Sequence, residues 1–169
     1  MQRKIIVIIM FGLFLSYIGH AEAQQAIFLV RHADTVKQEG NPDEPLSEAG
    51  QRRAVALAAL LKDSGINTIY TTALQRTVKT AEPLAKLLGI EPKVRTGAKP
   101  SDLENFANLL RTEHRRDVVL VVLHSTTAPA LIKILGHPVE IKIPETEFDN
   151  LFVITPRPDG PPTVLRLRY

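Results

Sequence analysis

The chain has 169 residues, of which 44% are hydrophobic and 23% are charged, and its formal net charge is +3. This length fits one domain with an ordinary core, and the absence of cysteine excludes disulfides, thiolate nucleophiles and Cys-ligated metal sites. The slight positive charge, the 5% aromatic content and the lack of tryptophan are unlike a nucleic-acid-binding surface, so we expect no nucleic-acid partner.

The first segment has the pattern of a secretory signal peptide. Arg3 and Lys4 precede an apolar stretch over 5–18, and an Ala-x-Ala tripeptide follows it. We therefore expect a signal peptide over 1–23 and a mature domain over 24–169. The expected location is secreted or periplasmic, with no stable membrane insertion after cleavage. An uncleaved N-terminal anchor is the alternative.

The remaining chain begins with two short strands around a helix. The apolar run 26–30 predicts a strand that is buried on both faces. Ser47 can cap a helix whose apolar face extends over 54–61, and Gly65 is expected to close it. A second strand is predicted over 68–71.

Apolar residues at helical spacing predict the next helix over 74–88, in which Pro83 should cause a kink or a restart. A weak strand is predicted over 93–95. The segment 101–104 has the form of a capping box and predicts a further helix. The most apolar strand of the chain follows over 118–123.

A short helix is predicted over 129–135, and two strands over 151–155 and 163–169 are joined by a Pro/Gly-rich turn. These last strands are close enough in sequence to pair as an antiparallel hairpin. Strands that alternate with helices predict an α/β domain, a three-layer α/β/α sandwich with a mostly parallel sheet.

Polar residues follow three of the predicted strands. Arg31 and His32 come after the first strand, His124 follows the most apolar strand, and Arg76 lies one helical turn beyond Thr72. In an open α/β sheet, ligands bind outside the carboxyl ends of the strands. We therefore expect the two arginines and the two histidines to face one pocket.

Such a cluster is suited to phosphoryl transfer. Guanidinium groups bind tetrahedral oxyanions with two parallel hydrogen bonds, and a rigid neutral imidazole is a nucleophile that can attack phosphorus. With the other groups neutralising charge, no metal and no cofactor is required. The sequence predicts transfer of a phosphoryl group to His32 and then to water. Taken singly, each of these residues also fits an ordinary structural or surface role.

Four blocks resemble the motifs of the histidine phosphatase superfamily, which has the phosphoglycerate mutase-like fold. The segment 29–35 resembles its Arg-His-Gly signature, and 45–50 resembles its Leu-Thr/Ser-x-x-Gly helix entry. The segment 70–81 resembles Ser-x-x-x-Arg-x-x-x-Thr-Ala, and 121–125 resembles the strand that delivers a second histidine. The short chain is similar to the small phosphatases rather than to the longer cofactor-dependent mutases.

The resemblance implies a role for each of the four residues. His32 would be the phosphorylated nucleophile, Arg31 and Arg76 would bind the phosphate, and His124 would complete the pocket as the fourth catalytic residue. The implied partner is a small phosphorylated substrate or a phosphoprotein. One departure is Ala33, which stands where glycine is commoner and for which we expect a minor effect.

A second departure concerns the general acid that protonates the leaving group. The segment 94–99, where the family places an acid, contains none, and His124 is followed by Ser125 instead of aspartate. The candidates that remain are four acidic residues, of which the capping box explains the last: Asp34, Glu44, Asp102 and Glu104. Without a strong acid, we expect good leaving groups, such as those of phosphoramidates or acyl phosphates, to be favoured.

Other functions stay open at this point. A non-catalytic phosphate- or phosphoprotein-binding domain would keep the arginines without turnover. A metal-dependent hydrolase could use the His-x-Asp spacing of His32 and Asp34, with His124 or His137 as further ligands. A mutase would need a retained phosphohistidine and a pocket for a second substrate.

Overall fold

The structure is a computed structural model that describes residues 26–95, 97 and 99–169. The predicted signal segment over 1–23 lies outside the described residues. Within those described ranges, no helix combines the length and the apolar character that crossing a bilayer requires.

Strands and helices alternate along most of the described chain, as predicted, until the last two strands follow each other directly. The elements are β1 (Ala26–Arg31), α2 (Glu48–Leu61), β2 (Thr68–Thr71), α3 (Gln75–Leu88), β3 (Lys93–Val94), α4 (Pro100–Thr112), β4 (Val118–Leu123), α5 (Thr127–Ile134), β5 (Asn150–Thr155) and β6 (Thr163–Arg168).

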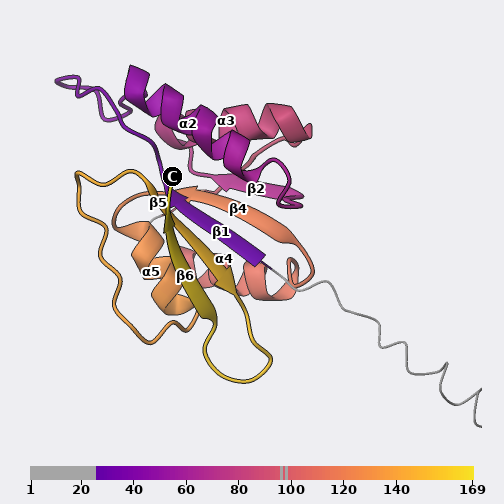
Figure 1. The fold of residues 1–169 in the computed structure, drawn as a ribbon. Coiled ribbons are helices and arrows are strands. Elements are labelled where there is room, and N and C mark those ends of the chain that lie inside the picture. Colours follow the sequence, from indigo (N-terminus) through magenta and orange to yellow (C-terminus); the bar gives the residue numbers. More distant parts are fainter. Residues whose placement is uncertain (1–25, 96, 98) are drawn as a thin grey trace, which may run out of the picture.

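The strands form one sheet in the order β3-β2-β4-β1-β5-β6. The first four strands in this order are parallel to one another, whereas β5 pairs antiparallel with both β1 and β6. The mostly parallel sheet and the closing hairpin are therefore confirmed. Because β5 runs against β1, the start of β5 lies beside the end of β1, where Val30 pairs with Leu151. Figure 1 shows the α5–β5 loop and the β1–α2 loop at the same end of the sheet.

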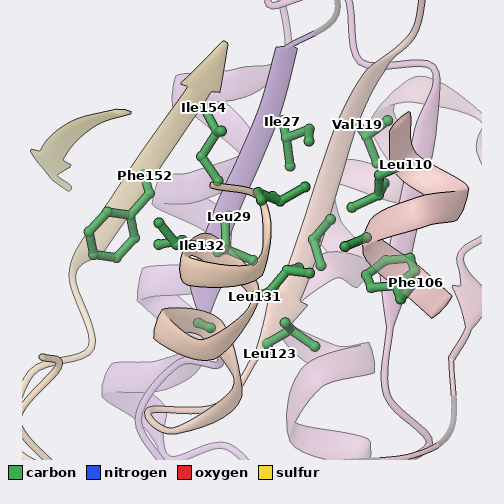
Figure 2. Packing of buried hydrophobic residues seen from close by; sticks show 14 of the residues in the cluster. Ile27, Leu29, Phe106, Leu110, Val119, Leu123, Leu131, Ile132, Phe152 and Ile154 are labelled. Atoms are coloured by element: carbon green, nitrogen blue, oxygen red, sulfur yellow. The ribbon is translucent and has the colours of Figure 1, made fainter. Parts of the chain in front are cut away.

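Helices cover both faces of the sheet and complete the predicted three-layer sandwich, with α2 and α3 on one side and α4 and α5 on the other (Figure 1). Side chains of β1 alternate between the two cores. Ile27 and Leu29 pack under α4 and α5, as Figure 2 shows, whereas Val30 packs under α2 and α3. A strand that is apolar on both faces can be buried only inside the sheet, and β1 and β4 lie side by side at its centre.

The predicted start of α4 is wrong. The helix begins at Pro100 with Lys99 as the N-cap residue, so Ser101 lies inside the helix and does not cap it. The Asp102 carboxylate accepts a hydrogen bond from the backbone N–H of Lys99 at 3.2 Å. Proline is favoured at the first helical position because its missing N–H would have no partner there. Glu104 is therefore not part of a capping box, contrary to the prediction.

Three smaller expectations also differ from the structure. Helix α5 begins at Thr127, ahead of the predicted start, and Pro129 is tolerated because it lies in the first turn. Helix α3 continues through Pro83 as one element, so no restart occurs there. Helix α2 ends at Leu61, and Gly65, with a φ of +76°, belongs to the turn that follows.

Two leucines of α3 provide a matched test of the core, because Leu84 is fully buried and Leu87 is 62% exposed. We expect Leu84→Ala to lower the free energy of unfolding by about 3 kcal/mol, since the substitution removes buried carbon and leaves a cavity. The control Leu87→Ala should change it by less than about 0.5 kcal/mol. Urea unfolding measures both variants, and equal losses would contradict this placement of the core.

Candidate active site

A pocket of about 960 Å³ lies at the carboxyl ends of β1 and β4. The β1–α2 loop and the α5–β5 loop both contribute to its walls. The structure brings all four of the predicted site residues to its lining, namely Arg31, His32, Arg76 and His124. These side chains come from distant parts of the sequence and meet because β1, β4 and the start of α3 share this edge of the sheet.

His32 follows β1 directly, and its backbone N–H donates to the carbonyl oxygen of Leu123 at 2.8 Å, which continues the pairing with β4. Its Nδ1 lies 2.8 Å from the carbonyl oxygen of Ala33. Because a carbonyl can only accept, Nδ1 carries the proton and Nε2 keeps its lone pair. The His124 ring lies edge-on to the His32 ring, with 5.3 Å between their centroids.

Both histidines are neutral at physiological pH. The pKa of His32 is lowered to about 4, mainly by burial and also by the neighbouring charges of Arg31 and Arg76, against an opposing backbone hydrogen bond. Burial likewise lowers the pKa of His124 to about 4, assisted by His32 and the same arginines. The His32 ring is therefore a free-base imidazole beside permanent positive charge, which is the state that a nucleophile requires.

Arg31 is held by the α5–β5 loop. Its Nη1 donates to the carbonyl oxygens of Pro144, Glu145 and Glu147 at 3.0, 2.9 and 3.2 Å. Its Nη2 donates to the Glu145 carboxylate at 2.8 Å, and the guanidinium carbon lies 4.1 Å from the centre of the Phe148 ring. Burial lowers the pKa of Arg31, whereas Glu145 acts in the opposite direction. An arginine so placed stays charged.

Arg76 lines the pocket from the first turn of α3. Its Nη1 donates to the carbonyl oxygen of Pro42 at 2.9 Å. The backbone N–H of Gln75 donates to the Asp43 carboxylate at 2.8 Å, so the β1–α2 loop is attached to the start of this helix. These contacts orient Arg76 toward the same pocket as His32.

Buried hydroxyl groups connect the site residues to one another. The Thr80 hydroxyl accepts from the backbone N–H of Ala33 at 2.9 Å and donates to the carbonyl oxygen of Arg76 at 2.7 Å. The half-buried Thr72 hydroxyl lies 3.4 Å from Nε2 of His124. Thr80 thus connects the backbone beside the His32 ring to the first turn of α3.

The β1–α2 loop returns to the sheet through a close contact with α2. A Cβ atom on Gly50 would lie 2.1 Å from the carbonyl oxygen of Asp34, so only glycine fits at this point of the helix. The same carbonyl accepts the backbone N–H of Ser47 at 2.9 Å, and the Asp34 carboxylate accepts from Arg53 at 2.7 Å. Asp34 is therefore engaged with α2 and does not line the pocket.

Of the acid candidates predicted from the sequence, Glu44 alone lines the pocket in the described residues. The Thr35 hydroxyl donates to its carboxylate at 2.9 Å. Glu145 and Phe148 are among the pocket residues that sequence reasoning missed. One signal could have indicated them: if β5 pairs antiparallel with β1, the loop before β5 must lie at the carboxyl end of β1.

The predicted metal-ligand set is not assembled. Asp34 pairs with Arg53, away from the pocket that contains His32 and His124, and His137 is not among the lining residues. Across residues 26–95, 97 and 99–169, no group of three or more His, Asp or Glu side chains is arranged to hold a metal ion.

The lowered pKa of His32 predicts a dependence of stability on pH. The folded pKa of about 4 lies below the ordinary histidine pKa of 6.5, so the unfolded chain takes up the proton first as the pH falls. The stability that His32 contributes is fully present above the pKa of the unfolded chain, and it is lost as the pH falls toward the pKa of the folded protein. When the pH falls from 7 to 5, we expect the unfolding free energy of the parent protein to decrease by about 2 kcal/mol more than that of His32→Gln. Denaturant unfolding at both pH values measures this, and equal losses would contradict a depressed pKa.

Thr80 provides a test of the hydroxyl connection. Thr80→Val leaves the Ala33 N–H buried without an acceptor, so we expect a loss of about 2 kcal/mol in unfolding free energy. The matched variant Thr80→Ser keeps the hydroxyl and should lose only about 0.8 kcal/mol, the contribution of one methyl group. Urea unfolding compares the two, and a serine variant as unstable as the valine variant would show that the hydroxyl is not the group that matters.

Part of the chain is similar to proteins of a known family. Residues 27–103 match the family model of the histidine phosphatase superfamily, branch 1. A probable phosphoglycerate mutase GpmB from Cronobacter sakazakii is 37% identical over 78 residues, which cover 41% of this chain and 36% of that protein. The GpmB protein of Photorhabdus laumondii is 36% identical over the same length and share. The matched region is therefore only about a third of the length of these curated relatives.

Solved structures with a similar fold cover almost the whole described chain. The protein histidine phosphatase SixA complexed with tungstate superposes with a TM-score of 0.70 at 18% identity, covering 85% of this chain and 96% of that one. A phosphoserine phosphatase from Entamoeba histolytica gives a TM-score of 0.63 at 16% identity and covers 86% and 97%. At these identities the likeness concerns the fold. The matched family model covers residues 27–103, a little under half of the chain, and the four motif blocks resemble the same histidine phosphatase superfamily.

Proposed function

We propose that the protein is a metal-independent phosphatase that hydrolyses phosphomonoesters or similar phosphorylated substrates through a phosphohistidine on His32. The observation that carries the proposal is the state of the His32 ring: buried, neutral and protonated on Nδ1, with Nε2 free. Two arginines and a second histidine line the same pocket, so a bound phosphate would face the nucleophile with its charge compensated.

The reaction has two balanced steps. In the first, His32 Nε2 attacks phosphorus, the N–P bond forms, and the bond to the leaving group breaks. The leaving group departs with the bonding pair and takes up a proton. In the second, water attacks phosphorus, the N–P bond breaks, and orthophosphate leaves with His32 restored. Arg31 and Arg76 stabilise the negative charge on the transferring oxygens in both steps.

His124 completes the pocket from the end of β4. A neutral imidazole has one N–H, and this group can donate to an oxygen of the transferring phosphoryl group. Its low pKa belongs to the pocket without an anion, because burial and the positive neighbours disfavour the imidazolium form. A bound phosphate would oppose this effect and strengthen the hydrogen bond to His124.

The leaving group needs a proton in the first step. Glu44 is the sequence-predicted carboxylate that lines the pocket, and it accepts a hydrogen bond from Thr35. If no strong acid serves the reaction, phosphoramidates and acyl phosphates would react faster than alkyl esters. A series of aryl phosphates measures this, and rates that depend only weakly on leaving-group basicity would contradict it.

The names of similar proteins favour a second candidate as well. The curated relatives are probable phosphoglycerate mutases, whereas the structural neighbours include a protein histidine phosphatase and a phosphoserine phosphatase. A mutase would return the phosphoryl group from His32 to a second hydroxyl instead of to water. Release of orthophosphate from 3-phosphoglycerate supports the phosphatase, whereas isomerisation without release supports the mutase.

A phosphatase assay on purified protein tests the proposal. We expect His32→Ala to lose hydrolysis of p-nitrophenyl phosphate by about a thousandfold or more, because the nucleophile is removed. His137→Gln, a histidine outside the pocket, is the control and should retain activity. EDTA should have no effect, and the parent protein should carry acid-labile phosphate after reaction with a phosphodonor. Loss of activity in EDTA with recovery in zinc or manganese would replace this mechanism, and phosphate binding without turnover would favour a non-catalytic domain.

A further inference from the structure

A carboxylate of the chain itself occupies two hydrogen-bond donors of the pocket. Glu145 Oε2 accepts from Nη2 of Arg31 at 2.8 Å, and Oε1 accepts from the Ser125 hydroxyl at 2.6 Å. Both donors line the pocket together with His32. One oxyanion with two oxygens thus bridges the arginine at the end of β1 and the serine that follows His124.

Among the described residues, the Glu145 side chain is held in the pocket only by these two hydrogen bonds, while its backbone carbonyl accepts from Arg31 Nη1. Its side chain is 76% exposed, whereas the Arg31 side chain is 5% exposed. The nearby Glu147 is held differently, because its carboxylate accepts from Asn150, Arg166 and Arg168 at 2.8–3.1 Å. The loop is therefore fixed through Glu147, while the Glu145 side chain can leave without moving the backbone that holds Arg31.

We propose that Glu145 is a built-in competitor for the phosphate, and that a bound phosphate displaces it and takes Arg31 Nη2 and Ser125 Oγ as its own donors. That the entering anion is a substrate rests on the proposed function, but Glu145 would compete with any tetrahedral oxyanion that enters the pocket. Ser125 would thereby be a phosphate-binding residue, at the position where the family resemblance implies an aspartate.

The geometry favours competition over a role for Glu145 as proton donor. The hydrogen bond from Ser125 lowers the pKa of the Glu145 carboxyl, and Arg31 lowers it further, so the group is ionised at neutral pH. An ionised carboxylate cannot protonate a leaving group, but it can replace an anion on a guanidinium. Its return would also assist release of orthophosphate, which two arginines would otherwise retain.

Direct binding of orthophosphate to the full chain, measured by titration calorimetry, tests the proposal. An exposed ion pair contributes up to about 1 kcal/mol, so we expect Glu145→Gln to lower the Kd of orthophosphate about fivefold. Glu44→Gln removes the same charge from the same pocket without touching Arg31 and should give a smaller gain. Tighter binding cannot result from misfolding, so the expected sign is itself a control.

Ser125→Ala in the Glu145→Gln background tests the second donor. We expect this double variant to bind orthophosphate several-fold more weakly than Glu145→Gln alone, because Ser125 would donate to the ligand. The proposal is overturned if Glu145→Gln binds orthophosphate no more tightly than Glu44→Gln does, or if Ser125→Ala has no effect in that background. Either result leaves the proposed function intact when His32-dependent hydrolysis is observed. Conversely, if Glu145→Gln binds orthophosphate more tightly but the protein shows no turnover, the role of Glu145 as a competitor is supported and the proposed phosphatase function is contradicted.

Discussion

A buried guanidinium loses its hydration, and the chain must supply acceptors in place of water. Arg31 is only 4% exposed, and the segment 144–148 provides carbonyl oxygens, a carboxylate and an aromatic face around it. This requirement positions the α5–β5 loop against the end of β1. One wall of the pocket is therefore fixed by the contacts to the two terminal nitrogens of this guanidinium, and His32, the proposed nucleophile, is the next residue along the chain.

The same burial has opposite consequences for the two kinds of basic side chain in the pocket. Arg31 remains charged because the ordinary pKa of a guanidinium is far above neutrality and because its acceptors compensate the lost water. His32 and His124 begin near neutrality, so burial is sufficient to remove their protons. The pocket thus combines permanent positive charge with a free imidazole lone pair on His32, the proposed nucleophile.

The fold and the main cluster could be predicted because their signals are local. The apolar runs that became β1 and β4 are buried on both faces, and polar residues directly after them must lie at one edge of a parallel sheet. The role of Glu145 could not be predicted, because it depends on which strand β5 pairs with, and no local pattern specifies that partner. The start of α4 was missed for a different, local reason: Ser101 is a common N-cap residue, yet Pro100 takes the first helical position.

Loops on a protein surface usually tolerate changes of length. The segment from Pro144 to Phe148 is an exception, because residues close together in it bind different partners: the Glu145 side chain reaches the pocket and the Glu147 side chain reaches β6. Insertion or deletion of one residue would move these residues away from their partners and break several contacts together, whereas substitution of a single side chain breaks only its own. Variation in length is thus better accommodated in the β5–β6 turn over 156–162, on which neither Arg31 nor His32 depends.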